Sequence, residues 1–295
     1  MTVKRKSNWY IYVIAFGITL LFVLAAIFAF RWFLFPDKTV ATGLDTQGEL
    51  SDNFKPSDEY NFNMLTMLSD GEQDIPELFV MASYDSVENR FTFIPLPNGI
   101  SVSTQGRTLP NVYAAQGGSG VISALNGILG IPCDSYVRLN RSEFVNLISS
   151  YGNVEYDVAK TIIIKDGVEV ETINSGKVFF TAEMMFRYIM LADFGEGELY
   201  RFNCIGGVLS ELVNQNFRNV DSSLFDAYFY MLRNSSDNNL TEAKYLKKKA
   251  ALLNTTEYGN SPAEYYIPYG EYTEDGGFAI ADNSIISIKQ KAGLL

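Results

Sequence analysis

The sequence predicts an α/β (α+β) fold, a mixed central β-sheet flanked by helices, preceded by one N-terminal transmembrane helix. Three observations predict it. From Asn61 onward, strand-like and helix-like segments alternate, as in a sheet covered by helices. Residues 9–30 carry no charge and, as a helix, would reach about 33 Å, enough to cross a hydrocarbon core of about 30 Å. Hydrophobic residues make up 47% of the chain, too few for several membrane spans.

The apolar segment is predicted to anchor the protein in a membrane, with the N-terminus in the cytoplasm. Lys4, Arg5 and Lys6 precede it, and the positive-inside rule places such a cluster on the cytoplasmic side. A cleaved signal peptide is disfavoured because the apolar run is long and no small-x-small cleavage site follows it. The predicted parts are a cytoplasmic tail (1–8), a transmembrane helix (9–35), a linker (36–60) and an extracytoplasmic domain (61–295).

Charge and composition exclude several classes of function. The net charge is −11, and because residues 1–36 hold four basic and no acidic side chains, the remainder is more acidic still, at −15. Such a surface repels polyanions, so no nucleic-acid partner is expected. The chain has no histidine, which excludes Ser-His-Asp and Cys-His catalysis and most zinc sites. Any chemistry must use carboxylates, Arg, Lys, Tyr or a metal held by oxygen atoms.

Apolar runs rich in Phe, Val and Ile predict buried strands. The pair Asp166-Gly167 lies between two such runs and predicts a tight hairpin turn, and the tail from Tyr265 predicts further short strands. We expect strands at residues 77–84, 90–95, 135–139, 161–165 and 168–172.

Capping residues and apolar periodicity predict the helices. Ser119, Ser142 and Thr181 are expected to cap helix N-termini, and Gly130 and Gly152 to end helices. We expect helices at residues 119–129, 142–151, 181–191, 202–217, 222–233 and 240–253. Cys133 and Cys204 are both expected on the external side, where a disulfide is possible, but their apolar surroundings favour two buried thiols.

Two stretches carry a set of residues in a distinctive order. Residues 91–158 contain Gly117-Gly118, Ile128-Leu129-Gly130-Ile131, Asp134, Tyr136, Phe144, Leu147 and Gly152-Asn153-Val154-Glu155. Residues 179–213 contain Tyr188, Asp193, Gly197 and Arg201. In this order and spacing the chain resembles the LytR-CpsA-Psr family over residues 61–289.

The resemblance implies a bacterial cell-membrane protein with a single span and an external catalytic domain. Family members transfer a glycopolymer from a polyprenyl pyrophosphate lipid to peptidoglycan. Arginines and a carboxylate-held Mg²⁺ would stabilise the charge on the leaving pyrophosphate, and an apolar tunnel would hold the lipid tail. The implied partners are the cytoplasmic membrane, a polyprenyl-linked lipid and other envelope-assembly proteins.

The chain departs from the family pattern at the arginines. Leu96-Pro97 stands where the family has Arg-Asp, Ile189-Met190-Leu191-Ala192 where it has Val-Arg-x-Arg, and Glu198-Leu199-Tyr200-Arg201 where it has Arg-x-x-Arg. Asp193 and Arg201 remain and are the catalytic candidates. Losing one preorganised donor costs about 10²–10³ in rate, so we predict a catalytically impaired relative.

Ligand-binding candidates come from two sources. Arg107 and Arg201 could contact a phosphate. Met184, Met185 and Ile189 lie on a very apolar helix and could line a lipid tunnel, although such a helix is more often part of a core.

Asp70 and Asp74 are the candidates for a metal site, although a solvated acidic loop is the default explanation in an acidic protein. The residues themselves identify no cofactor, and Mg²⁺ is expected only of an active enzyme. Three functions stay open. The favoured one is an impaired family member in cell-envelope assembly that binds a polyprenyl-linked precursor or a partner protein. The others are an active phosphotransferase using a rearranged set of residues, and a structural envelope protein without a ligand.

Overall fold

The computed structural model describes residues 54–295 except 71–73, 103–106, 167–168, 236 and 275. The predicted cytoplasmic tail, the predicted transmembrane helix and residues 36–53 of the predicted linker lie outside the described residues. Among the helices that are described, none is both long enough and apolar enough to cross a bilayer.

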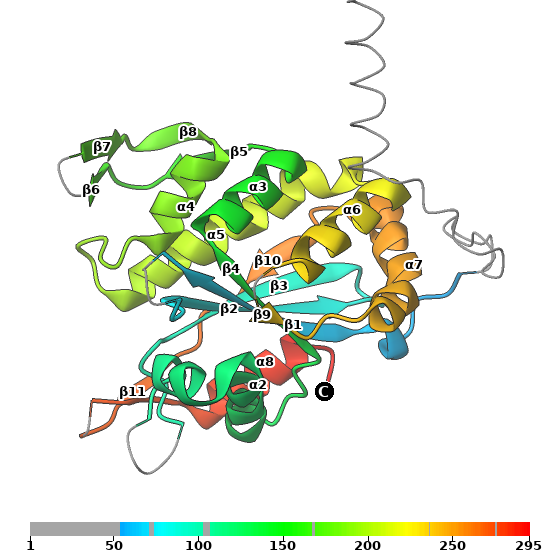
Figure 1. The fold of residues 1–295 in the computed structure, drawn as a ribbon, viewed down its shortest axis with the longest axis horizontal. Coiled ribbons are helices and arrows are strands. Elements are labelled where there is room, and N and C mark those ends of the chain that lie inside the picture. Colours follow the sequence, from blue (N-terminus) through cyan, green and yellow to red (C-terminus); the bar gives the residue numbers. More distant parts are fainter. Residues whose placement is uncertain (1–53, 71–73, 103–106, 167–168, 236, 275) are drawn as a thin grey trace, which may run out of the picture. The chain divides into compact units, whose positions relative to one another are not determined.

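The central sheet has six strands. They are β1 (Phe62–Ser69), β2 (Leu78–Asp85), β3 (Arg90–Leu96), β4 (Ser135–Asn140), β9 (Asp237–Asn238) and β10 (Ala263–Tyr265). Their spatial order is β10-β3-β2-β1-β4-β9 (Figure 1). β1 is parallel to β4 and antiparallel to β2, whereas β3 is antiparallel to β2 and parallel to β10. The sheet is therefore mixed, as the sequence predicted.

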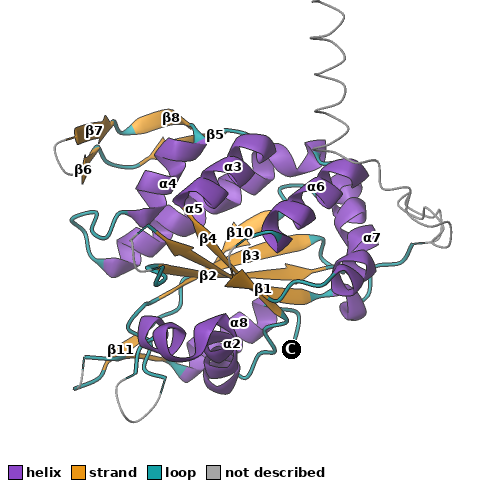
Figure 2. Cartoon of the chain, viewed as in Figure 1, coloured by secondary structure: helices purple, strands orange, loops and turns teal. Residues whose placement is uncertain are grey.

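Helices cover both faces of this sheet (Figures 1 and 2). One face carries α3 (Arg141–Tyr151), α4 (Ala182–Met190), α5 (Glu198–Asn216), α6 (Ser222–Arg233) and α7 (Glu242–Tyr258). The other carries α2 (Leu109–Leu129) and α8 (Asp282–Lys291). Successive side chains of a strand point to opposite faces of the sheet, so the strands contribute residues to the hydrophobic cores on both faces. Leu68 and Val80 belong to the cluster under α3, α4 and α5, whereas Leu65 and Met67 belong to the cluster under α2 and α8.

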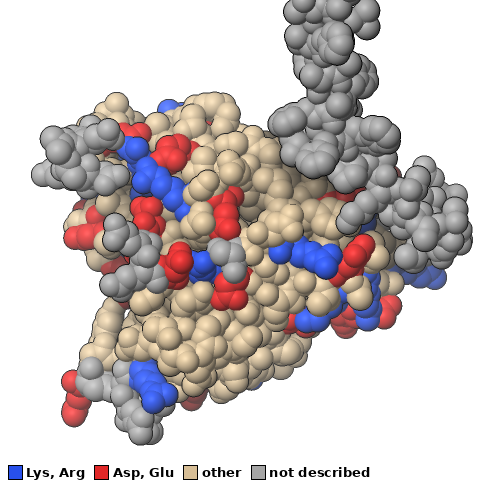
Figure 3. Space-filling model, in the orientation of Figure 1, with Lys and Arg blue, Asp and Glu red and all other residues tan. Residues whose placement is uncertain are grey.

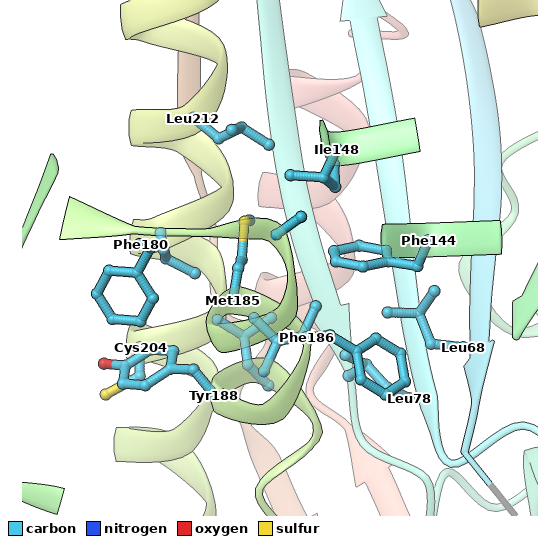
Figure 4. Packing of buried hydrophobic residues seen from close by; sticks show 14 of the residues in the cluster. Leu68, Leu78, Phe144, Ile148, Phe180, Met185, Phe186, Tyr188, Cys204 and Leu212 are labelled. Atoms are coloured by element: carbon cyan, nitrogen blue, oxygen red, sulfur yellow. The ribbon is translucent and has the colours of Figure 1, made fainter. Parts of the chain in front are cut away.

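The larger of these two cores is densely filled beneath α3, α4 and α5 (Figure 4). Phe144, Met185 and Phe186 meet Leu68 and Leu78 of the sheet there, and each side chain is at most 4% exposed. Burying apolar area of this kind is the main stabilising contribution to the fold.

Three two-stranded sheets lie outside the main one. β5 (Val154–Val158) pairs with β8 (Gly176–Phe180), β6 (Ile162–Asp166) with β7 (Glu169–Ile173), and β11 (Gly270–Tyr272) with β12 (Phe278–Ile280). The β6–β7 pair is antiparallel, which confirms the hairpin predicted from Asp166-Gly167.

Two of the three predicted helix N-terminal caps are wrong. α2 begins at Leu109 after Thr108, and Ser119 lies inside it, so the predicted cap is wrong. Gly117 has φ 65° and ψ −170°, a kink that made the second half look like a separate helix. The cap of α3 is Asn140 rather than Ser142: Asn140 and Glu143 form a reciprocal capping box. The expected cap Thr181 is confirmed, since its hydroxyl accepts from the Met184 amide.

The end of the chain differs from the expected run of strands. After β12, residues 282–291 form α8. Ile288 and Ala292, four residues apart, are buried in the core beneath α2, and Ile285 packs against the same core. The tertiary contact thus stabilises a helix in a short polar segment that shows little periodicity by itself. Cys133 and Cys204 are both buried free thiols, as the analysis favoured.

Candidate functional site

The candidate site lies at the edge of the sheet where β1, β3 and β4 end. These strands run parallel, so their carboxyl ends meet at one edge, and the antiparallel β2 begins there. The Glu77 amide donates to Leu68 O at 2.8 Å, which fixes the start of β2 beside the end of β1. In α/β sheets this edge is the usual place for a ligand.

A pocket of about 440 Å³ opens at this edge. Its lining comes from the residues just before β2 and just after β3, from the end of α4 and the segment after it, from the first turn of α5, and from β11. Its lining residues are Glu77, Asn98, Met190, Ala192, Asp193, Gly197, Glu198, Arg201 and Tyr272. The structure therefore brings together Asp193 and Arg201, the two catalytic candidates.

Arg201 supplies the guanidinium in this pocket. It is 8% exposed, and its Nε donates to Leu191 O at 2.8 Å. Burial lowers the pKa of Arg201, while the nearby carboxylates of Glu198 and Glu77 act in the opposite direction. Within the described part of the chain its Nη groups have no hydrogen-bond acceptor, which leaves these donors for a ligand.

Asn98 adds an unused acceptor. Its Nδ2 donates to Glu77 O at 2.6 Å, whereas its Oδ1 is buried and has no hydrogen-bond partner among the described residues. Asp193 Oδ1 accepts from the Gly195 amide at 2.7 Å, and Tyr272 donates its hydroxyl to Glu198. The pocket can thus bind a polar group through donors of Arg201 and the acceptor of Asn98. Arg201 faces three carboxylates in the lining, those of Glu77, Asp193 and Glu198, so the net charge is negative.

Three further arginines outside the pocket lining lie near the end of β4, at the start of α3 and on α4. They are Arg138, Arg141 and Arg187. Each is held by carboxylates: Arg138 by Asp74 at 2.6 Å, Arg141 by Glu183 and, at 3.8 Å, by Asp70, and Arg187 by Glu183 at 3.2 Å and Glu171 at 3.4 Å. On the face shown in Figure 3, basic and acidic side chains are likewise interspersed.

The sequence analysis did not identify this arginine network. One signal was present, because Arg138 lies near the end of the predicted strand 135–139 and Arg141 follows it, at the edge where ligands bind. The carboxylate partners come from distant segments, and their proximity is a product of the tertiary fold.

The structure separates the other predicted site residues. Arg107 is exposed in the loop before α2, and its carbonyl accepts from the Val102 amide. Asp70 and Asp74 contact arginines, and the described residues contain no group of three Asp, Glu or Cys side chains that could hold a metal ion. Met185 and Ile189 are fully buried in the core, and Met184 packs against it.

Comparison with known proteins gives the family. The model of the LytR_cpsA_psr family matches residues 76–262. This chain belongs to the LytR_cpsA_psr family. No sequence among the curated proteins is significantly similar to it.

Solved structures of similar fold agree with membership of the LytR_cpsA_psr family. A Eubacterium siraeum protein described as a transcription regulator has 28% identity and a TM-score of 0.76, over 84% of this chain and 98% of its own. B. subtilis TagV has 14% identity and a TM-score of 0.63, over 82% and 100%. TagT bound to LIIa-WTA has 15% identity and a TM-score of 0.60, over 86% and 98%.

The sequence resemblance predicts which lining residues stand at arginine positions of the LytR_cpsA_psr pattern. By that resemblance Met190, Ala192 and Glu198 would stand at three such positions, and all three line the pocket. Arg201 would stand at a fourth. Leu96, expected at another, is fully buried in the core beneath α2. Of these expected arginine positions in the pocket lining, Arg201 alone carries a guanidinium.

Proposed function

We propose that this chain is an extracytoplasmic family member in cell-envelope assembly that binds a polyprenyl-linked wall-polymer precursor without transferring it efficiently. One observation carries the proposal: the pocket has Met190, Ala192 and Glu198 at arginine positions and keeps Arg201 alone. TagT, a neighbour in fold, has been solved with LIIa-WTA and with LI-WTA bound, which supports a wall-polymer ligand.

The electrostatics support binding more than turnover. Transfer of a glycopolymer phosphate places growing negative charge on the departing pyrophosphate, and this charge needs several fixed donors. Each missing donor lowers the rate by about 10²–10³. Here one guanidinium faces the carboxylates of Glu77, Asp193 and Glu198. A ligand bound by hydrogen bonds to Arg201 and Asn98 is compatible with this pocket, whereas a strongly stabilised transition state is not.

A transfer assay tests the proposal. The full chain is reconstituted in vesicles with a polyprenyl-pyrophosphate-linked saccharide and a peptidoglycan acceptor, with and without Mg²⁺. We expect turnover at least about 10²-fold below that of a family member with all its arginines assayed in parallel. Comparable turnover would refute the proposal. Polyprenyl lipid should also be found by mass spectrometry in an organic extract of the purified chain.

Restoring the arginines gives a sharper test with a matched control. The triple variant Met190→Arg, Ala192→Arg, Glu198→Arg returns guanidinium groups to the pocket, and we expect its turnover to rise above that of the unmodified chain. Leu199→Arg adds one guanidinium next to Glu198 but outside the pocket lining, on a side chain that is 56% exposed, and should have no effect. Equal turnover of the two variants would show that the charge at the pocket is not what limits transfer.

One observation favours a second candidate, an active transferase with a rearranged set of residues. Arg138, Arg141 and Arg187 gather at the same sheet edge as Asp70 and Arg201. This candidate requires Mg²⁺-dependent turnover that Asp70→Asn and Arg141→Gln each abolish. Turnover insensitive to both substitutions would exclude it.

We also propose that the protein is anchored in the cytoplasmic membrane by residues 9–35 with its domain outside. The uncharged segment and the preceding Lys4, Arg5 and Lys6 support this orientation. Protease added to cells whose outer envelope has been removed should cleave the domain while the membrane stays intact. Protection of the domain would contradict the proposed orientation.

A further inference from the structure

A second pocket lies at the opposite edge of the sheet, where β1 and β4 begin, beneath α6 and α7. Its volume is about 320 Å³. Most of its lining is aromatic or aliphatic, including Phe62, Met64, Phe225, Phe229, Leu232 and Leu252. Pockets of this size lined by apolar side chains are characteristic of small-molecule sites. It shares no lining residue with the pocket around Arg201.

The aromatic hydroxyls in the lining are bonded to protein groups. Tyr245 donates its hydroxyl to Asp226 at 2.6 Å, and Tyr228 donates to Ser150 O at 3.0 Å. The ring of Phe229 stacks on that of Tyr245, with centroids 4.3 Å apart and planes 7° apart. The hydroxyls of Tyr228 and Tyr245 therefore already have hydrogen-bond partners, and these bonds hold the two tyrosine rings in place. The walls thus suit a hydrocarbon chain, which needs apolar contact and no hydrogen bonds.

Three lysines of α7 line the mouth of this pocket. Lys248 Nζ donates to Glu59 O and Asn61 O, both at 2.6 Å, so it holds the chain that precedes β1. Lys244 Nζ donates to Asp134 O at 2.7 Å and keeps further N–H groups for a ligand. Lys247 is 55% exposed and lies 3.8 Å from the Glu59 carboxylate.

The charge at the mouth of this pocket has the opposite sign to the net charge of the whole protein. The chain is acidic, with a net charge of −11, yet here three ammonium groups face the carboxylates of Asp134 and Glu59. The Asp134 carboxylate is already bound by the Asn63 amide at 2.9 Å. A local excess of positive charge beside an apolar cavity favours a ligand with an apolar chain and an anionic head.

We propose that this pocket binds a single-chain anionic amphiphile, with the alkyl chain between β1, α6 and α7 and the head group at Lys244 and Lys247. At about 30 Å³ each, the share of one water molecule in the liquid, the cavity has room for about ten groups of methylene size. The proposal is independent of transfer chemistry, because the two pockets share no residue and lie at opposite edges of the sheet.

Photolabelling tests the proposal. The full chain in phosphatidylcholine vesicles is irradiated with dodecanoic acid that carries a diazirine near its methyl end, and labelled residues are mapped by mass spectrometry. We expect labels on β1 and on the 225–232 segment of α6. Unlabelled dodecanoate or dodecyl phosphate should reduce the labelling, and the better competitor identifies the head group. Dodecanol should be at least about tenfold weaker, the equivalent of one lost charge-assisted hydrogen bond.

Two variants and a control complete the test. Leu232→Trp fills the cavity and should reduce labelling about tenfold or more, while Leu246→Trp, at a side chain 47% exposed on α7, should leave it unchanged. The double variant Lys244→Gln, Lys247→Gln leaves the apolar walls intact and should make dodecanol and dodecanoate equal competitors. Within residues 61–295, labels found only outside the pocket would overturn the proposal, and so would equal competition in the unmodified chain or labelling unaffected by Leu232→Trp.

Discussion

Arg138 of β4 and Asp74, in the loop before β2, form an ion pair across 64 positions of sequence, with Nη1 2.6 Å from Oδ1. The arginine side chain is 6% exposed, whereas the aspartate is 68% exposed. Arg138 also donates to the Asp74 carbonyl at 3.2 Å. These contacts hold Asp74 against β4 beside the start of β2.

Removing the charge of Asp74 tests this contact. Asp74→Asn keeps the shape and tolerates the positive φ of 56°, and it removes the carboxylate charge that lies 2.6 Å from Arg138 Nη1. We expect the free energy of unfolding to fall by about 1 kcal/mol, since Asp74 is mostly exposed and solvent screens the pair. Urea denaturation measures it. Asp70→Asn is the control, because Asp70 lies 3.8 Å from Arg141 and both are about a third exposed or more. An equal loss of unfolding free energy in Asp74→Asn and Asp70→Asn would contradict a specific stabilising role for the contact between Arg138 and Asp74.

Acid stability depends on Glu183. The hydrogen bond from Arg141, followed by contacts with Arg187, holds the pKa of Glu183 below its usual 4.5. A carboxylate with a lowered folded-state pKa stabilises the fold above the unfolded pKa, and this contribution is lost as the pH falls through the folded pKa. Glu183→Gln should therefore lose less stability than the unmodified chain below about pH 4.5. Denaturant titrations at pH 7, 4 and 3 measure the difference, and identical acid profiles would contradict it.

Leu96 is expected to be a core residue that cannot be converted back to the family arginine. Its side chain is fully buried beneath α2. Leu96→Arg would bury an unpaired charge and should lower the free energy of unfolding by about 3–5 kcal/mol, without raising transfer activity. Leu96→Met, which conserves volume, should cost less than about 1.5 kcal/mol. Thermal unfolding of the two variants measures this, and a stable Leu96→Arg protein would show that the position opens to solvent.

The kink of α2 places a glycine against a tyrosine ring. A Cβ on Gly118 would overlap the ring of Tyr136, whose hydroxyl donates to Asp237 at 3.0 Å. Gly118→Ala should lower the free energy of unfolding by about 1–3 kcal/mol. Gly127→Ala on the same helix meets nothing within 4 Å and should raise it by up to about 1 kcal/mol. Chemical denaturation compares the two, and equal effects would refute the clash.

The two cysteines should be unreactive in the folded protein. Both are buried, and burial raises the pKa of the Cys133 thiol to about 12 and also raises that of Cys204. Because the thiolate is the reactive form, a thiol reagent at pH 8 should modify neither cysteine until denaturant is added. Full modification of the native protein, or none after denaturation without reductant, would contradict this.

Local patterns in the sequence predicted much of the secondary structure. An Asp-Gly pair between two apolar runs predicted the hairpin of β6 and β7. Apolar periodicity predicted the helix 222–233, and a side-chain hydrogen bond within three residues forms the cap at Thr181. Such signals are weakest where a tertiary contact takes over. The predicted helix 119–129 is the second part of the longer helix α2, which has a kink at Gly117. Residues 282–291 form a helix that packs against α2.

For the site, the sequence by itself determined the family, and it predicts a loss of arginines at Met190, Ala192 and Glu198. Tertiary structure alone decided that these three positions line one pocket with Arg201, Glu77 and Asn98. It also decided that Arg138, Arg141 and Arg187 lie against carboxylates from other segments. The physical reason is range: periodicity and capping act over about four residues, whereas a charge cluster is made by chain segments that only the folded sheet brings together.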